Sequence, residues 1–414
     1  MEWPYFLDKL YKQEKTHSSK KQYRYLLKTI TMKKYNIILF WYMNDWGLYG
    51  RTYENIARGL AEHSDVNKVI CMLPPNKTAE SWCAFERKKE SNKLFIITPN
   101  PRFINSTGGL YKARQWLNRK FSLLSAIKAY CRLLGFKKSN TILWVFPHHK
   151  IIDDLIVNIP HHLLITQIVD NVLNKNDISQ GTRVLVTRQY EELPRQADIT
   201  ITSSQLNFTF FKNSSNCHLV ENGLDSAFIS QPTHLPCSAT PSKPRLGYLG
   251  FISERTDLVL LKKLAVERPN YEIIIAGPDN EQLLSSHGLL DLPNISTIDY
   301  VPYNQAPGFI QSLDVCLIPH IHSAFSQSMS PLKLFQYLAS GRPIVTTEVA
   351  GTERWKNLIY IADDYDDFML KIDSALTEDS KLSIQRIAAA KNETWPHRIE
   401  KLLTIIAKYN ERHA

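Results

Sequence analysis

Residues 328–345 read SMSPLKLFQYLASGRPIV, the pattern of a loop, a helix and a buried strand. Pro331 favours the first turn of a helix, Gly341 favours its end, and Pro343 opens the next strand. The unpaired N–H groups of a helix's first turn bind anions, so this loop is a candidate diphosphate site. Lys333 lies in that turn, where a cation opposes the helix dipole and an anionic ligand would explain it. The alternative is an ordinary helix whose lysine faces solvent.

The same alternation of strand and helix extends in both directions from this stretch. Short buried strands separated by helices predict parallel sheets with helices on both faces. Strands are expected at 36–42, 68–73, 93–98, 141–146, 163–169, 245–249, 272–276, 295–299, 315–319 and 343–347. Helices are expected at 51–63, 257–267, 307–313 and 332–339.

The chain divides at a proline-rich segment. Residues 230–244, SQPTHLPCSATPSKP, read as a linker between an N-terminal domain, 32–229, and a C-terminal domain, 245–394. We therefore expect an α/β fold with two Rossmann-like, doubly wound domains that face a cleft. Ligands of such sheets bind beyond the carboxyl ends of the strands. A basic extension, 1–31, precedes the first domain, and an amphipathic helix closes the chain at 395–414.

Composition narrows the class of protein. No apolar run reaches the roughly 18–20 residues of a membrane span, no secretory signal is visible at the N-terminus, and six scattered cysteines form no CxxC pair. These features favour reduced thiols and a cytoplasmic protein. The net charge of +10 comes from the first 34 residues and from 101–150, a stretch with ten Lys/Arg and no acid. The basic amphipathic segment 111–138 is either a contact for anionic membrane or a solvated face. With no recognition motif present, nucleic-acid binding is not expected.

Several motifs together resemble a known family. SPLKLFQYLASGRPIV is similar to the donor-site segment of GT-B glycosyltransferases of the retaining family-4 type, in the branch with teichuronic-acid biosynthesis glycosyltransferases. GYLGFISERTD from Gly247 resembles that branch's first C-domain strand and phosphate loop. ADITITSS from Ala197, VENGLD from Val220, LDVCLIP from Leu313 and the helix from Trp395 also fit. The resemblance covers residues 140–410 well and the first 130 only in outline. It implies a C-terminal helix that crosses back to the N-terminal domain.

The resemblance implies roles for individual residues. Lys333 and Arg255 would stabilise the departing diphosphate, and Gln336 would hold the ribose. The implied donor-binding residues are Gly250, Ser253, Gly277, Pro278, Val301, Tyr303, Ser328, Ser330, Pro331, Leu332 and Gln336.

The sequence departs from the family pattern at two of these positions. The family-4 donor signature is a pair of glutamates eight positions apart, and here Ser328 and Gln336 stand there. The related branch already lacks the first glutamate. A glutamine still bonds a ribose diol, but it gives up the charge-assisted strength of a carboxylate.

The N-terminal half offers fewer candidates. Gly47 and Gly50, in the loop 42–53, would let a substrate approach the backbone, and the resemblance implies that this substrate is the acceptor; the alternative is a plain connection. His148 and Asp170 each follow a predicted strand and are candidate catalytic groups. The histidine has a structural alternative. The acidic triplet at 364–366 matches a metal-binding signature but reads as a helix N-terminus, so no metal site is expected.

The expected function is transfer of a sugar from a nucleotide diphosphosugar to a saccharide or lipid-linked acceptor. By resemblance, transfer would retain the anomeric configuration, need no metal or further cofactor, and serve cell-surface polysaccharide synthesis at the inner face of the membrane. A sugar-nucleotide 2-epimerase is an alternative, although no carboxylate cluster is visible in the C-terminal half. The other alternative is a non-catalytic binding subunit with the same fold.

Overall fold

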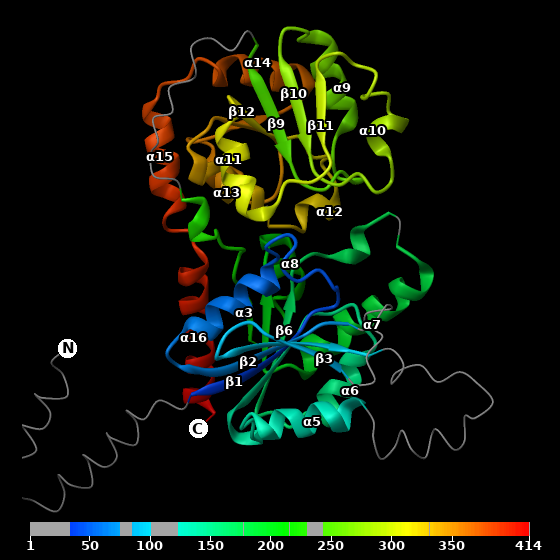
Figure 1. The fold of residues 1–414 in the computed structure, drawn as a ribbon, viewed down its shortest axis with the longest axis vertical. Helices are drawn as coiled ribbons and strands as arrows, with labels where there is room; N and C mark the ends of the chain where they lie inside the picture. The colour runs from blue at the N-terminus through cyan, green and yellow to red at the C-terminus, as the bar shows by residue number, and fades with distance from the viewer. Residues whose placement is uncertain are drawn as a thin grey trace, which may run out of the picture.

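The computed structural model describes residues 34–74, 85–100, 123–176, 178–214, 216–229, 243–330 and 332–413. Within these ranges the chain forms two α/β domains, each built on one sheet (Figure 1). The N-terminal sheet has eight strands in the order β3-β4-β2-β1-β5-β6-β7-β8. The C-terminal sheet has six, in the order β11-β10-β9-β12-β13-β14. The expected α/β fold with two doubly wound domains is confirmed.

The elements have the following bounds. The N-terminal strands are β1 (Tyr35–Phe40), β2 (Val66–Met72), β3 (Phe85–Lys89), β4 (Leu94–Pro99), β5 (Thr141–Val145), β6 (Leu163–Ile168), β7 (Ile199–Thr202) and β8 (Cys217–Leu219). The helices around them are α3 (Thr52–Glu62), α5 (Leu123–Leu133), α6 (Ile151–Asn158), α7 (Gln180–Gln196), α8 (Gln205–Phe211) and α16 (Trp395–Arg412). The C-terminal strands are β9 (Arg245–Leu249), β10 (Glu272–Ala276), β11 (Ile295–Ile298), β12 (Val315–Ile318), β13 (Ile344–Thr347) and β14 (Tyr360–Ala362). The C-terminal helices are α9 (Leu258–Glu267), α10 (Leu283–Ser286), α11 (Ala306–Gln311), α12 (Ala324–Gln327), α13 (Leu332–Ser340), α14 (Tyr365–Ala375) and α15 (Lys381–Ala390).

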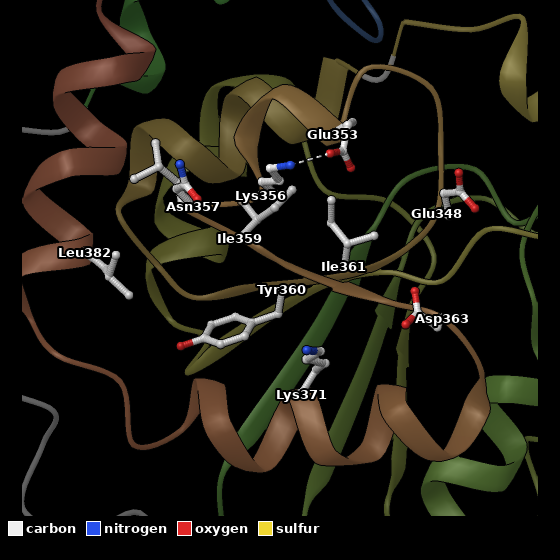
Figure 2. A pocket seen from close by; sticks show the side chains of 11 residues that line it. Glu348, Glu353, Lys356, Asn357, Ile359, Tyr360, Ile361, Asp363, Lys371 and Leu382 are labelled. Atoms are coloured by element: carbon white, nitrogen blue, oxygen red, sulfur yellow. Dashed lines mark hydrogen bonds and ion pairs between the residues drawn. The ribbon is translucent and has the colours of Figure 1, made fainter.

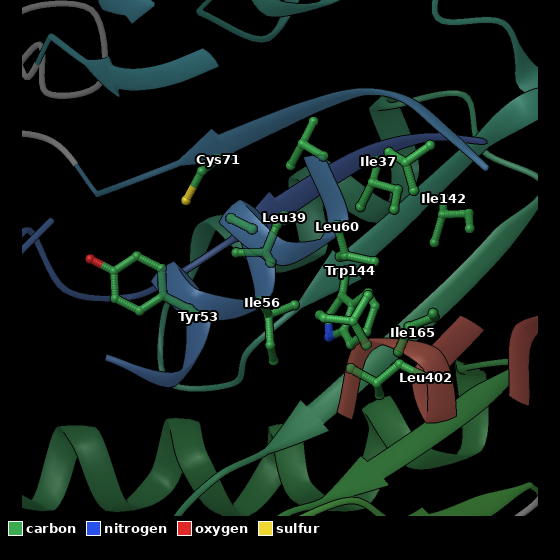
Figure 3. Packing of buried hydrophobic residues seen from close by; sticks show 14 of the residues in the cluster. Ile37, Leu39, Tyr53, Ile56, Leu60, Cys71, Ile142, Trp144, Ile165 and Leu402 are labelled. Atoms are coloured by element: carbon green, nitrogen blue, oxygen red, sulfur yellow. The ribbon is translucent and has the colours of Figure 1, made fainter. Parts of the chain in front are cut away.

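Strand β1 shows why both faces of the N-terminal sheet are covered. Ile37 and Leu39 belong to one buried cluster, and Ile38 and Phe40 belong to another. Successive side chains of a strand point to opposite faces, so a continuous apolar run requires a layer on each side. Figure 3 shows the first cluster, which also contains residues of α3 and of α16.

Helix α16 returns from the C-terminal domain to the N-terminal one (Figure 1). Trp395, Ile399, Leu402 and Ile406 are buried in the same cluster as β1. Gly59 of α3 permits this contact, because a Cβ there would lie 2.7 Å from Ile399 Cγ1. The expected crossing-back helix is therefore present.

One edge strand departs from the expectation of parallel pairing. Strand β3 runs antiparallel to β4, with Arg87 opposite Ile97. Its sequence, FERKK, is largely exposed and has no buried run, so the apolar pattern did not predict a strand there. Charged side chains on an edge strand disfavour pairing with another chain.

Several predicted segments lie outside the described residues: the extension 1–31, the linker except its last two residues, and residues 111–122 of the basic segment. In the described ranges, no helix combines the length and apolarity needed to cross a bilayer. The described cysteines, Cys71, Cys131, Cys217 and Cys316, are free thiols.

Candidate active site

Two small cavities meet where the carboxyl ends of the two sheets face each other. The first, called here the Gln336 cavity, has a volume of about 160 Å³ and is lined mainly by the C-terminal domain. The second, the Asp170 cavity, has about 150 Å³ and is lined by both domains. Since ligand pockets usually have about 300–1,000 Å³, each cavity alone is small, and the two are treated as one site. Four residues line both: Arg51, Arg255, Leu332 and Lys333.

The Gln336 cavity brings together most of the predicted donor residues. Its lining includes Gly250, Arg255, Gly277, Pro278, Val301, Tyr303, Leu332, Lys333 and Gln336. They follow three different strands of the C-terminal sheet or lie on α13, so they are far apart in the sequence and converge at one edge of the sheet, as doubly wound folds require.

Lys333 stands in the first turn of α13 with its ammonium group inside the site. Nζ lies 3.8 Å from the ring centroid of Tyr248 and 3.4 Å from Nε2 of His320. Burial is the main cause that lowers the pKa of Lys333 to about 8; the charge of Arg255 acts in the same direction, and Tyr248 opposes it. Burial, Lys333 and Arg255 also hold the pKa of His320 well below its ordinary value, so this imidazole is neutral and accepts from the ammonium. The lysine thus has no carboxylate partner among the described residues.

Arg255 provides a second cation at the same place. Its Nη1 lies 3.5 Å from Met329 Sδ, and its Nε is buried with no hydrogen-bond partner among the described residues. A buried cationic N–H without an acceptor is costly. The pair Arg255 and Lys333 therefore suits an anionic ligand.

Two glycines let the backbone come close beside these cations. Gly250 has φ 151° and Gly277 has φ 141°, and side chains rarely adopt either value. A Cβ on Gly250 would lie 2.8 Å from Lys333 Nζ, and one on Gly277 would lie 2.1 Å from the Gly250 carbonyl oxygen. Both positions consequently require glycine for the lysine and the two loops to pack.

Ser328 and Ser330 are held by the N-terminal domain. The Ser328 carbonyl accepts hydrogen bonds from Ser204 Oγ at 2.8 Å and Asn207 Nδ2 at 2.9 Å. The Ser330 carbonyl accepts from Asn222 Nδ2 at 2.8 Å, and Ser330 Oγ accepts from the Asn222 backbone N–H at 3.2 Å. Ser330 lines the Asp170 cavity, and Ser328 lines neither cavity. These bonds fix the loop before α13.

The remaining donor candidates divide between the cavity and its surroundings. Tyr303 donates to Asp225 Oδ2 at 3.3 Å, and burial raises the pKa of its hydroxyl. Gln336 is half-buried and its side chain bonds no described residue, which leaves its amide available to a ligand. Ser253 lines neither cavity, and its N–H donates to Thr256 Oγ1 at 3.4 Å. Pro331 lies outside the described residues.

Asp170 follows β6 and supplies the carboxylate that lines the second cavity. Burial raises the pKa of this carboxyl group, while Arg255 and Arg51 oppose that shift. Its backbone carbonyl accepts from the Tyr190 hydroxyl at 2.8 Å, which fixes the loop. Among the lining residues of the two cavities, Asp170 is the carboxylate best placed to accept a hydrogen bond from an acceptor hydroxyl.

His148 lies behind this cavity and does not line it. Its Nε2 lies 2.8 Å from the Tyr190 hydroxyl, and its ring packs edge-on against Tyr42 with centroids 4.6 Å apart. Burial lowers its pKa to about 3. In this position the imidazole is neutral at physiological pH and supports two tyrosines.

The two glycines of the N-terminal loop differ in their surroundings. Gly50 is buried with φ 58°, and a Cβ there would lie 2.3 Å from Tyr303 Cε2 of the other domain. Gly47 is exposed with φ 81°, has open space around its Cα, and lines neither cavity. Gly50 therefore permits contact between the domains.

Sequence reasoning did not single out Arg51, Asn222 or His320 as site residues. Each lines the Asp170 cavity, and Arg51 also lines the Gln336 cavity. The sequence signal for Asn222 is its place in VENGLD, a motif that contributes to the family resemblance without indicating a role for this residue.

The acidic triplet at 364–366 has a structural use. Asp364 caps α14 by accepting from the Asp367 N–H at 2.8 Å, and Asp366 pairs with Lys263 at 2.8 Å. Within the described ranges, no group of three or more His, Cys, Asp or Glu side chains is arranged to hold a metal ion.

A further cavity, of about 520 Å³, opens beside β14 and shares no lining residue with the two cleft cavities (Figure 2). Its charged residues include Glu353 and Lys356, which pair with each other at 2.9 Å. No glycine among the described residues lines this cavity, and each of its lysines pairs with a carboxylate. The cleft therefore remains the candidate active site.

Comparisons with known proteins agree with this geometry. Residues 243–378 match the family model described as Glycosyl transferases group 1. A teichuronic acid biosynthesis glycosyltransferase of Bacillus subtilis, TuaH, is 25% identical over 227 residues, a match that covers 51% of this chain and 57% of that protein. The chain thus spans little more than half the length of this relative.

Solved structures share the fold over nearly the whole chain. A sucrose-phosphate synthase from Thermosynechococcus elongatus has a TM-score of 0.67 at 15% identity, covering 92% of this chain and 100% of that one. A trehalose-6-phosphate structure from E. coli bound with UDP-2-fluoro glucose has a TM-score of 0.61 at 10% identity, covering 89% and 98%. These likenesses show a GT-B fold, and with the family match over residues 243–378 they support a glycosyltransferase.

Proposed function

We propose that this protein transfers a sugar from a nucleotide diphosphosugar to a saccharide or lipid-linked acceptor. The transfer retains the anomeric configuration, uses no metal ion and serves the synthesis of a cell-surface polysaccharide. Retention and the polysaccharide role rest on the sequence resemblance and on the teichuronic acid relative. The transfer itself is supported by one observation: Arg255 and Lys333 lie together beside the start of α13, and neither forms an ion pair with a described residue.

These two cations suit the chemistry of a departing nucleoside diphosphate. When the bond between the sugar's anomeric carbon and the phosphate oxygen breaks, the electron pair stays on the diphosphate. Preorganised cations and helix N–H groups stabilise that charge, and one such contact commonly contributes about 3–4 kcal/mol. Arg255 and Lys333 have this position, with the glycine loops beside them.

The rest of the donor fits the Gln336 cavity. Gln336 bonds the ribose hydroxyls, and the loops with Pro278 and Val301 hold the base. The acceptor enters the Asp170 cavity, where the Asp170 carboxylate accepts a hydrogen bond from the attacking hydroxyl. Domain closure excludes water and aligns the two substrates.

A lipid-linked acceptor would bring the protein to the inner face of an anionic membrane. A small cavity of about 290 Å³ beside α5 has an apolar floor that includes Phe136, and four cations around it: Lys128, Arg132, Lys137 and Lys138. Leu133, the last residue of α5, is 84% exposed. Co-sedimentation with vesicles containing anionic lipid tests this contact, and equal binding to neutral vesicles argues against it.

The alternative is a binding subunit that has kept the fold. Gln336 motivates it, because this residue lacks the charge that strengthens a bond to ribose. A 2-epimerase is disfavoured, since Asp170 is the single carboxylate among the lining residues of the two cavities.

The discriminating experiment incubates the protein with a panel of nucleotide sugars and acceptor extract, and measures released nucleoside diphosphate and labelled glycan. Transfer from one donor supports the proposal. Donor binding without any product supports the subunit, and interconversion of two nucleotide sugars supports the epimerase.

A further inference from the structure

We infer that Arg51 is a third anion-binding residue of the site, contributed by the N-terminal domain. The inference rests on the proposed function for its setting, and it adds a residue to which no role has been assigned. The ligand it binds is an anionic oxygen group of the phosphate type.

The first argument is placement. Arg51 immediately precedes α3 and lines both cleft cavities, as only four residues of the lining do. Its guanidinium carbon lies 5.1 Å from the ring centroid of Tyr49 and 5.4 Å from that of Phe251, which belongs to the C-terminal domain. The two rings pack edge-on with centroids 4.8 Å apart, and the guanidinium lies against both of them, which restricts its orientation.

The second argument concerns the hydrogen-bond donors of the Arg51 guanidinium, of which only Nε bonds a described residue. Nε donates to Asp45 Oδ2 at 2.9 Å. Asp45 is itself buried and also accepts from Tyr53 and Trp41, at 2.9 and 3.2 Å. The two terminal nitrogens of Arg51 bond no described residue, so both stay available for a bidentate contact with a phosphate or carboxylate. The bond to the buried Asp45 fixes the position of the guanidinium, as a ligand-binding arginine requires.

The third argument is charge. Arg255 and Lys333 supply two positive charges from the C-terminal domain, and Arg51 adds a third from the opposite wall. Asp170 is the single carboxylate among the lining residues, and Asp45 behind Arg51 pairs with its Nε at 2.9 Å, so three cations are offset by two carboxylates. An anion bound between the walls would contact both domains, so its binding would favour the closed arrangement.

Two sources can provide this anion: the diphosphate of the donor or an anionic group on the acceptor. Variants Arg51→Gln and Arg51→Lys are compared with wild type by calorimetry, using UDP, GDP and inorganic phosphate as probes. Arg188→Gln is the control, because Arg188 also lies in the N-terminal domain but pairs with Asp153 away from both cavities. Thermal unfolding shows that each variant is folded.

The expected result is at least a tenfold loss of affinity in Arg51→Gln, a smaller loss in Arg51→Lys, and none in Arg188→Gln. Loss for the nucleoside diphosphate identifies the donor as the source. Loss for inorganic phosphate with unchanged nucleoside diphosphate affinity identifies an anionic acceptor. Folded Arg51→Gln that binds all three probes like wild type overturns the inference. Wild type that binds phosphate but no nucleoside diphosphate would instead refute the proposed function.

Discussion

The side-chain amide of Asn222 donates to the carbonyl oxygen of Ser330 at 2.8 Å, and this bond joins the N-terminal domain to the loop that opens α13. Asn222 Oδ1 also accepts from Thr52 Oγ1 at 2.7 Å, which ties the same amide to α3. All three residues are buried. The loop that presents Lys333 is thus positioned by the opposite domain as well as by its own helix.

Replacing Asn222 with alanine should therefore reduce both stability and donor binding. It leaves a buried carbonyl unpaired, which costs about 1–3 kcal/mol, and it loosens the loop before Lys333. Urea unfolding measures the first effect and titration with a nucleoside diphosphate the second. Thr52→Val is the matched control, because it removes the link to α3 and keeps the bond to Ser330. Asn222→Ala with unchanged donor affinity would show that the loop needs no support from the N-terminal domain.

Gly50→Ala should be more harmful than Gly47→Ala. Both glycines have positive φ, which costs an alanine about 1–2 kcal/mol, but only the Gly50 Cβ would meet the Tyr303 ring, at 2.3 Å. Gly47→Ala should lose about 1 kcal/mol and retain activity, while Gly50→Ala should also displace Tyr303 and weaken donor binding. Equal effects of the two substitutions would contradict a close contact between the domains at Gly50.

Donor affinity should fall as pH rises through about 8. Burial lowers the pKa of Lys333 from 10.5 to about 8, so the free protein loses this ammonium charge above that pH. Stability should change in the opposite sense. Between pH 8 and 10.5 the unfolded chain binds the proton that the native lysine has lost, so the contribution of Lys333 to the free energy of unfolding rises with pH.

Lys333→Met isolates this effect from other titrating groups. Its stability advantage over wild type should be largest below pH 8 and should shrink by pH 10.5, as measured by urea unfolding across that range. Its nucleoside diphosphate affinity should be low and should lack the step near pH 8. A constant stability difference at all pH values would mean that the lysine is not buried in its charged form.

Gln336→Glu should tighten nucleotide-sugar binding. The carboxylate would accept charge-assisted hydrogen bonds from the ribose diol, about twice as strong as those of an amide, and a gain of about 1 kcal/mol corresponds to roughly fivefold in affinity. Gln336→Leu removes the hydrogen bonds at similar volume and should weaken binding. If glutamate weakens binding as much as leucine does, the ribose does not lie against this residue.

The sequence predicted the sheets and the donor loops because their signals are local. Runs such as NIILF and EIIIA are apolar on both faces and occur in sheets covered on both sides. Gly250, Arg255 and Lys333 stand in recognisable loops beside those strands. Strand β3 was not predicted, because FERKK has no apolar run and forms a strand only by pairing with β4.

The contributions of the N-terminal domain could not be predicted in the same way. Arg51 becomes part of the site only because Phe251 and Lys333 come from the other domain. Asn222 contributes to the site through its bond to Ser330, which lies 108 residues away in the sequence. His148 was singled out because it follows a strand, yet the packing of Tyr42 and Tyr190 turns it away from the cavities. The contacts of Arg51 and Asn222 depend on how the two domains meet, and those of His148 depend on packing within the N-terminal domain; no local pattern specifies either.

The most direct test of the central claim is calorimetric titration of the protein with a panel of nucleoside diphosphates. Wild type should bind at least one of them, and Lys333→Ala and Arg255→Ala should each weaken that binding by at least tenfold while remaining folded. Wild type that binds none of the panel, or folded variants that bind as tightly as wild type, would contradict a donor site at the start of α13.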